Sequence, residues 1–108
     1  MRAPTEFEQR VYAAVSTIPV GRVTTYKSLA KHVGCGSSQA VGQALKRNPF
    51  APDVPCHRVI SSQLKLAGYM GKVEGEEVQR KKELLATEGV EFDSSGSLLD
   101  SERLIDHW

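Results

Sequence analysis

Apolar residues recur at three- and four-residue steps near the start of the chain, in the segment TEFEQRVYAAVSTI. Such spacing places them on one face of an amphipathic helix. The residues are Phe7, Val11, Val15 and Ile18. Thr5 is placed to cap the first turn, and Glu8 completes a capping box with it. Because Pro19 and Gly21 resist further helix, the pattern predicts a helix over residues 5–18.

Two shorter helices are predicted next, in the segments TTYKSLAKHVG and SQAVGQALKRN. Thr24 or Thr25 would cap the first of them, and Gly34 stands at its C-terminal end. Ser37 or Ser38 would begin the second after the short break CGSS. The apolar stripes are formed by Tyr26, Leu29, Ala30 and Val33 in the first and by Val41, Ala44 and Leu45 in the second. Two short helices joined by a tight, glycine-containing turn predict a helix-turn-helix.

The second half of the chain combines irregular, β-like and helical segments. Residues 48–55 are proline-rich, and the following HRVISSQLKLAGYMG has β-branched residues around a polar turn, which predicts a small hairpin or wing. Helical periodicity returns in GEEVQRKKELLATEGVEF and ends at Gly89, with short strands expected near 90–92 and 97–99. We therefore expect a mainly α, winged helix-turn-helix-like single domain with a small β-hairpin wing.

Composition narrows the class of protein. A chain of 108 residues with 40% hydrophobic and 25% charged residues is typical of one globular domain with a modest core. The sequence contains no apolar run of the roughly 20 residues that span a bilayer. Its first ten residues lack the apolar centre of a signal peptide. We expect an intracellular protein, cytoplasmic or nuclear, with no membrane association.

Charge is unevenly distributed along the chain, although its net value is only +1. Between Arg22 and Lys72, eight basic residues and one acid give +7. Between Val73 and Trp108, ten acids and four bases give −6. A basic middle followed by an acidic C-terminal region favours one face that binds a polyanion.

Cys56 stands in the stretch PCHRVI, beside His57 and Arg58. Nearby positive charge or a hydrogen-bonded imidazole favours the reactive thiolate of a cysteine, so Cys56 is a candidate nucleophile. The alternative is a buried cysteine that packs as a small apolar residue. A disulfide with Cys35 is disfavoured in a reducing compartment, and the histidines lack metal-ligand spacing, so no metal is expected.

Five blocks in this order and spacing resemble the DNA-binding domain of the O6-alkylguanine-DNA alkyltransferases: PVGRVTTYKSLAKHVG, AVGQALKRNP, PCHRVI, GYMG and LLATEGV. The resemblance covers about residues 6–92 and leaves 93–108 as an acidic C-terminal extension. It implies a winged helix-turn-helix monomer that binds double-stranded DNA in the minor groove and flips out O6-alkylguanine. The alkyl group would pass irreversibly to Cys56, in a single turnover without a cofactor.

The resemblance also implies a role for each matching residue. Cys56 would accept the alkyl group, His57 would take its proton through a water, and Glu88 would orient the imidazole. The other implied roles are a brace for the turn (Asn48), a proton donor to the guanine (Tyr69), contacts to the DNA (Tyr26, Ser38, Gln39, Ala40 and Arg58) and the base pocket (Val59 and Met70).

Three departures from the family pattern keep a second function open. The N-terminal domain usual in these enzymes is not in the sequence, which makes it similar to the alkyltransferase-like proteins. Those proteins bind O6-alkylguanine and recruit nucleotide excision repair proteins, but they usually carry tryptophan or alanine where Cys56 stands here. Gln39 occupies the position of the family's arginine finger, and Met70 replaces a small residue. A helix-turn-helix regulator is a third reading, which leaves PCHRVI and GYMG unexplained.

Overall fold

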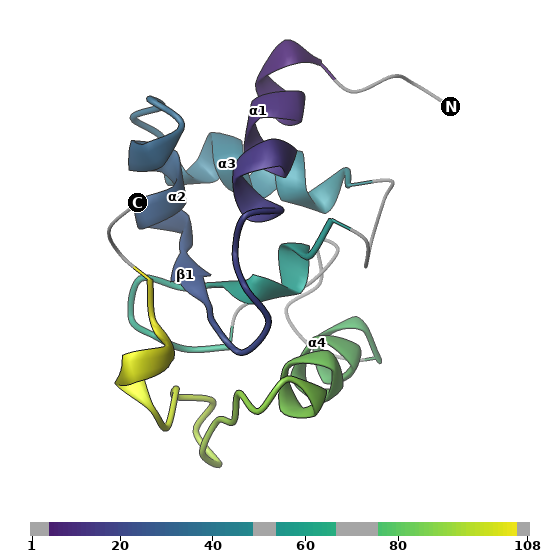
Figure 1. The fold of residues 1–108 in the computed structure, drawn as a ribbon, viewed down its shortest axis with the longest axis vertical. Coiled ribbons are helices and arrows are strands. Elements are labelled where there is room, and N and C mark those ends of the chain that lie inside the picture. Colours follow the sequence, from purple (N-terminus) through teal and green to yellow (C-terminus); the bar gives the residue numbers. More distant parts are fainter. Residues whose placement is uncertain (1–4, 49–53, 67–75, 106–108) are drawn as a thin grey trace.

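The computed structural model describes residues 5–48, 54–66 and 76–105. Three helices from the first half of the chain pack together, and a fourth lies on the far side of a small sheet (Figure 1). The elements are α1 (Glu6–Val15), β1 (Thr24–Thr25), α2 (Tyr26–His32), α3 (Ser38–Lys46), the 3-10 turn η1 (Cys56–Arg58), β2 (Val59–Ile60), α4 (Glu76–Thr87) and the 3-10 turn η2 (Ser101–Arg103). The mainly α fold predicted from the sequence is confirmed.

The first helix begins as its capping residues predict. The Thr5 side chain accepts a hydrogen bond from the backbone N–H of Glu8, and the Glu8 carboxylate accepts one from the N–H of Thr5. The carboxylate of Glu8 also lies 3.4 Å from Nη1 of Arg47, directly after α3. The capping pair therefore also connects α1 to the end of α3.

Helices α2 and α3 form the predicted helix-turn-helix. Thr25 caps α2 and Ser37 caps α3, each through its hydroxyl. Gly34 follows the C-cap of α2 with φ +76°, the left-handed conformation for which glycine is favoured. Together with α1 these helices enclose the larger of two apolar clusters, and Cys56 and Val59 belong to it.

The two strands connect distant parts of the chain. β1 and β2 pair in parallel, with Thr24 opposite Val59 and Thr25 opposite Ile60. This pairing sets η1, directly before β2, close to the start of α2. Of the predicted hairpin, the described residues contain a tight turn in which the Ser61 N–H donates to the Lys65 carbonyl. Residues 67–71 of that hairpin lie outside the described ranges.

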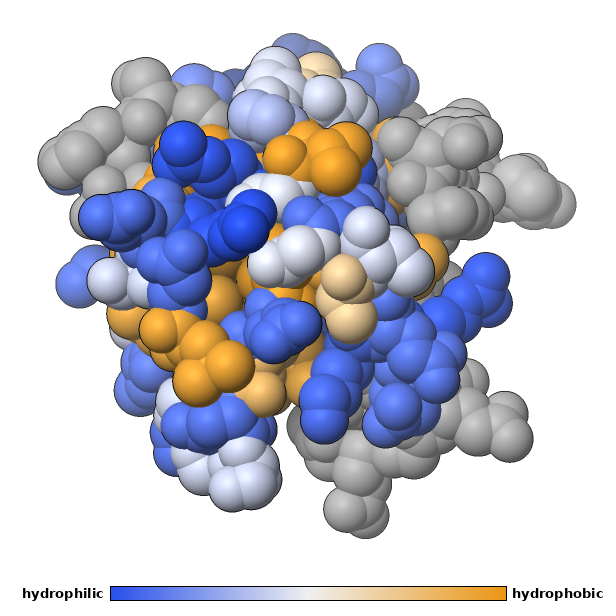
Figure 2. Space-filling model, turned by 60° about the horizontal axis from the view of Figure 1, so that its bottom comes forward, coloured by the Kyte–Doolittle hydropathy of each residue, from blue (hydrophilic) through white to orange (hydrophobic). Residues whose placement is uncertain are grey.

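The C-terminal segment completes a second, smaller apolar cluster of Val23, Ile60, Leu85, Val90 and Phe92. The segments expected as strands near 90–92 and 97–99 form isolated antiparallel bridges: Phe92 pairs with Leu98, and Ser97 pairs with Lys65. On the side of α4 and this segment, the surface is mostly hydrophilic with separate hydrophobic patches (Figure 2). No helix in the described residues is long and apolar enough to cross a membrane.

Candidate active site

Cys56 opens the 3-10 turn η1 and is 4% exposed. Its backbone N–H donates to the Val54 carbonyl at 2.8 Å, and the Arg58 N–H donates to the Pro55 carbonyl at 2.9 Å. Asn48, buried directly after α3, donates from Nδ2 to the same Val54 carbonyl at 3.0 Å. These bonds fix the backbone that carries the Cys56 thiol. The bond from Asn48 is the kind of contact by which a residue braces a turn.

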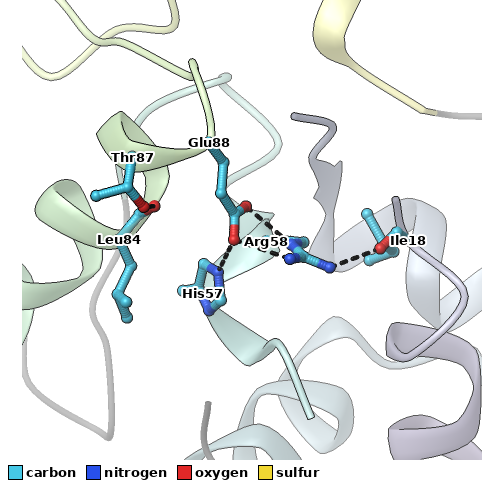
Figure 3. Close-up of polar contacts among 6 residues, drawn as sticks. All are labelled: Ile18, His57, Arg58, Leu84, Thr87 and Glu88. Carbon is cyan, nitrogen blue, oxygen red and sulfur yellow. Dashed lines mark hydrogen bonds and ion pairs between the residues drawn. The ribbon is translucent and has the colours of Figure 1, made fainter. Parts of the chain in front are cut away.

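His57 and Arg58 meet the carboxylate of Glu88, which follows α4 (Figure 3). Nε2 of His57 lies 3.0 Å from Oε2 of Glu88. Arg58 donates to both carboxylate oxygens, from Nε at 2.9 Å and from Nη2 at 2.8 Å. Its third nitrogen, Nη1, donates to the Ile18 carbonyl at 2.8 Å. A bidentate guanidinium therefore holds the carboxylate in place against the imidazole. We call His57, Glu88 and Arg58 the relay.

The protonation states of the relay follow from burial and charge. Burial lowers the pKa of His57 and outweighs the opposing hydrogen bond and charge of Glu88. Burial would raise the pKa of Glu88, but hydrogen bonds from Arg58 and His57 and their charges lower it instead. At neutral pH the relay consequently pairs a carboxylate with a neutral imidazole.

The free nitrogen of His57 is in position to take a proton. Since Nε2 faces an ionised carboxylate, the imidazole hydrogen belongs on Nε2 and the lone pair on Nδ1. Nδ1 is buried and has no hydrogen-bond partner among the described residues. This tautomer is the one that a general base requires.

Lys81 of α4 is a residue of this site that the sequence analysis missed. It is 0% exposed, its Nζ donates to the Val59 carbonyl at 2.7 Å, and Nζ lies 5.9 Å from the ring centroid of Tyr26. Burial lowers the pKa of Lys81 from 10.5 to about 8, and the charge of an ionised Cys56 opposes that shift. Its sequence signal is a lysine within the apolar stripe of α4, three residues after Val78 and four before Leu85.

A surface hollow of about 380 Å³ lies between the helix-turn-helix and the residues after β2. It is lined by Tyr26 of α2, by Ser38, Gln39, Gly42 and Gln43 of α3, and by Ser61 and Ser62. Three of the residues expected to contact DNA thus share one concave surface. Burial, and then the charge of Cys56, raises the pKa of Tyr26 to about 12, so its phenol remains a hydrogen-bond donor.

The remaining predicted residues are placed as follows. Val59 is fully buried, and its carbonyl already accepts the Lys81 bond. Ala40 is half-buried on α3. The guanidinium of Arg58, expected to contact DNA, donates to the Glu88 carboxylate and to the Ile18 carbonyl. Tyr69 and Met70 lie outside the described residues.

The structure also bears on two alternative roles for Cys56, a disulfide with Cys35 and a metal site. Both Cys35 and Cys56 are free thiols. Within the described ranges, no group of three or more His, Cys, Asp or Glu side chains could hold a metal ion.

The sequence is similar to that of known proteins over most of its length. The sequence model described as "6-O-methylguanine DNA methyltransferase, DNA binding domain" matches residues 6–90. The methylated-DNA–protein-cysteine methyltransferase of Mycobacterium leprae is 44% identical over 97 residues, which cover 89% of this chain and 56% of that protein. The chain thus spans about half the length of the curated relatives that it matches.

Two solved structures are also similar to this chain. The crystal structure of the Mycobacterium tuberculosis O6-methylguanine methyltransferase superimposes with a TM-score of 0.69 at 40% identity, covering 94% of this chain and 55% of that one. S. pombe Atl1, in complex with damaged DNA containing O6-carboxymethylguanine, superimposes with a TM-score of 0.72 at 34% identity, covering 97% and 98% of the two chains. From the match over residues 6–90, this chain belongs to the family of the 6-O-methylguanine DNA methyltransferase DNA-binding domain.

Proposed function

We propose that this protein binds double-stranded DNA containing O6-alkylguanine and transfers the alkyl group to Cys56. The observation that carries the proposal is the buried Cys56, next in the chain to His57, whose Nε2 lies 3.0 Å from the Glu88 carboxylate. A nucleophile, a neutral base and a carboxylate that orients the base form the apparatus of nucleophilic catalysis.

The proposed reaction is a single displacement. Cys56 gives its proton to Nδ1 of His57 through a water, and the imidazolium that forms is stabilised by Glu88. The thiolate attacks the alkyl carbon, so that a carbon–sulfur bond forms while the bond to O6 breaks. The electron pair of the broken bond stays on the guanine, which takes a proton from Tyr69. Because a thioether is a poor leaving group, the protein reacts once.

DNA would lie across α3 and the hollow beside it. Small residues of α3 allow close approach of a backbone or base, and an added Cβ at Gly42 would meet nothing within 4 Å. The flipped base would enter from this face, with Tyr26 and Gln39 lining the way. Since Gln39 lacks the plane and charge of a guanidinium, it would fill the gap in the duplex by hydrogen bonding alone.

The experiment is a stoichiometric assay of the removal of the methyl group from O6-methylguanine in DNA. A duplex with one O6-methylguanine is incubated with excess protein, and the remaining O6-methylguanine is quantified after hydrolysis of the DNA. We expect complete loss with the wild-type chain and with Cys35→Ser, and no loss with Cys56→Ser. Persistence of O6-methylguanine with the wild-type chain contradicts the proposal.

The second candidate is a lesion-recognition protein that recruits nucleotide excision repair proteins. It is favoured by one observation, the superposition on S. pombe Atl1 in complex with damaged DNA, with a TM-score of 0.72. On this alternative, Cys56→Ala binds lesion DNA as tightly as the wild-type chain, and the DNA remains alkylated. In both cases the affinity should fall steeply with salt, since basic side chains that neutralise phosphates displace counterions from DNA.

A further inference from the structure

The segment after the family match, residues 91–105, is fixed to the start of the helix-turn-helix. The N–H of Val23 donates to the Arg103 carbonyl at 2.9 Å, and the N–H of Ile105 donates to the Val23 carbonyl at 2.7 Å. The hydroxyl of Thr24 donates to the Ile105 carbonyl at 2.7 Å. In Figure 1 the end of this segment, in yellow, approaches β1 from below. We call residues 100–105 the strap.

The side chain of Arg103 leaves the strap and lies against two glycine turns. Its Nη1 donates to the Gly21 carbonyl at 3.1 Å. An added Cβ at Gly21 would lie 3.0 Å from Nη1 of Arg103 and 3.2 Å from the Glu88 carbonyl. At Gly89, an added Cβ would lie 3.4 Å from Nη2 of the same guanidinium. The strap, the Gly21 turn and the Gly89 turn therefore meet at the guanidinium of Arg103.

Each of these turns follows a residue that accepts hydrogen bonds from Arg58. The turn at Gly21 follows Ile18, whose carbonyl accepts Nη1 of Arg58 at 2.8 Å. The turn at Gly89 follows Glu88, whose carboxylate accepts the other two Arg58 nitrogens. Arg58 and Arg103 thus contact the same two turns, and the Gly89 turn directly follows the carboxylate that meets the imidazole.

We propose that Arg103 is a positioning residue of the relay: by holding the Gly21 and Gly89 turns together, it keeps the Glu88 carboxylate against His57. This inference rests on the proposed function for its effect on alkyl transfer. On this proposal the strap positions the relay as well as packing Leu104 against the second apolar cluster. The ion pair of Arg103 with Asp100, at 3.8 Å between partly exposed side chains, contributes little by comparison.

The test replaces the guanidinium and reads the relay directly. Arg103→Met keeps an aliphatic chain of similar length but removes the contacts of Nη1 and Nη2 with the two glycine turns. Arg103→Lys keeps the positive charge. Asp100→Asn is the matched control. Asp100→Asn removes the ion pair but keeps an oxygen that can accept the Glu102 N–H. The first readout is the pH midpoint of the His57 imidazole in NMR titrations, assigned by comparison with His57→Gln.

We expect Arg103→Met to lower the His57 midpoint, because the raising influence of Glu88 is weakened while burial, Arg58 and Lys81 still lower it. The rate of reaction with O6-methylguanine DNA should fall roughly tenfold, part of the 10²–10⁴ that acid–base catalysis contributes. Arg103→Lys should restore both values in part, and Asp100→Asn should match the wild-type chain.

A wild-type midpoint and rate in both Arg103 variants would overturn the proposal, even if the variants unfold more easily. If Arg103→Met does not fold, Arg103→Lys decides by the same two readouts. If the wild-type chain transfers no alkyl group at all, the proposed function fails, and the His57 midpoint still decides whether Arg103 positions the relay.

Discussion

The buried lysine of α4 gives the sharpest test of the site's electrostatics. Lys81 is fully buried, and its ammonium is held by the Val59 carbonyl at 2.7 Å beside the ring of Tyr26. Lys81→Met replaces it with an apolar side chain of similar length. The substitution removes the charge and this hydrogen bond while leaving the space filled.

The magnitude follows from the lowered pKa of Lys81. A pKa of about 8 in the folded chain, against 10.5 when exposed, corresponds to about 3 kcal/mol at about 1.4 kcal/mol per pH unit. Below pH 8 Lys81 is charged in both the folded and the unfolded chain, so the stability is lowered by the full free energy of burying the charge. Above pH 10.5 it is neutral in both states, and the cost is zero. Between these values the unfolded chain binds more protons, so wild-type stability rises with pH.

The assay compares the free energy of unfolding in urea for the two proteins at pH 7.5 and pH 10.5. At pH 7.5 the variant gains about 3 kcal/mol from the missing buried charge and loses about 1–3 kcal/mol with the hydrogen bond. Because the hydrogen-bond and packing contributions change little with pH, the advantage of the variant should shrink by about 3 kcal/mol at pH 10.5. Lys82→Met, at the exposed neighbouring position, is the matched control and should show no such change.

A stability difference that is the same at both pH values would refute a pKa of about 8 for Lys81.

The Lys81→Met variant also tests whether the ammonium of Lys81 acts on the Cys56 thiol. In a Cys35→Ser background, the rate of Cys56 alkylation by iodoacetamide at pH 7.5 should fall in Lys81→Met, since the substitution removes the ammonium that interacts electrostatically with Cys56. An unchanged rate would mean that the ammonium does not act on Cys56.

Three further substitutions test other parts of the site. Glu88→Gln leaves Arg58 facing a neutral amide, so the free energy of unfolding in urea should fall by about 2 kcal/mol. An unchanged free energy of unfolding would contradict a stabilising ion pair between Arg58 and Glu88. Gly21→Ala should lower the melting temperature, because φ is +87° and the new Cβ meets a guanidinium nitrogen at 3.0 Å; an unchanged value would contradict the close approach. Gly42→Ala should instead stabilise helix α3 by about 1 kcal/mol while weakening binding to duplex DNA, and equal DNA affinity would place the duplex elsewhere.

The helices could be predicted from the sequence because their signals are local. Thr5 and Glu8 are three residues apart, and both bonds of the capping box form as that spacing implies. Gly34 and Gly89 end α2 and α4 with positive φ, since a left-handed residue there favours glycine. Patterns within one or two turns of helix carry this information without any knowledge of the fold.

The sheet and the interior of the site could not be predicted in this way. β1 and β2 have two residues each, too few for a period-2 pattern, and their parallel pairing joins segments about 35 residues apart. The bond from Arg58 to Glu88 joins residues 30 positions apart, and adjacency in PCHRVI does not indicate which way the guanidinium turns. Lys81 was missed because charged residues are almost never fully buried, so composition argues against its position.

The central claim is that Cys56 accepts the alkyl group, and the most direct measurement is the mass of the peptide that contains it. The protein is incubated with duplex DNA carrying one O6-methylguanine, digested, and analysed by tandem mass spectrometry. We predict a gain of one methylene mass on Cys56, none on Cys35, and none on either thiol with undamaged DNA. An unmodified Cys56 after complete binding to the lesion DNA would contradict the proposal and favour lesion recognition without repair.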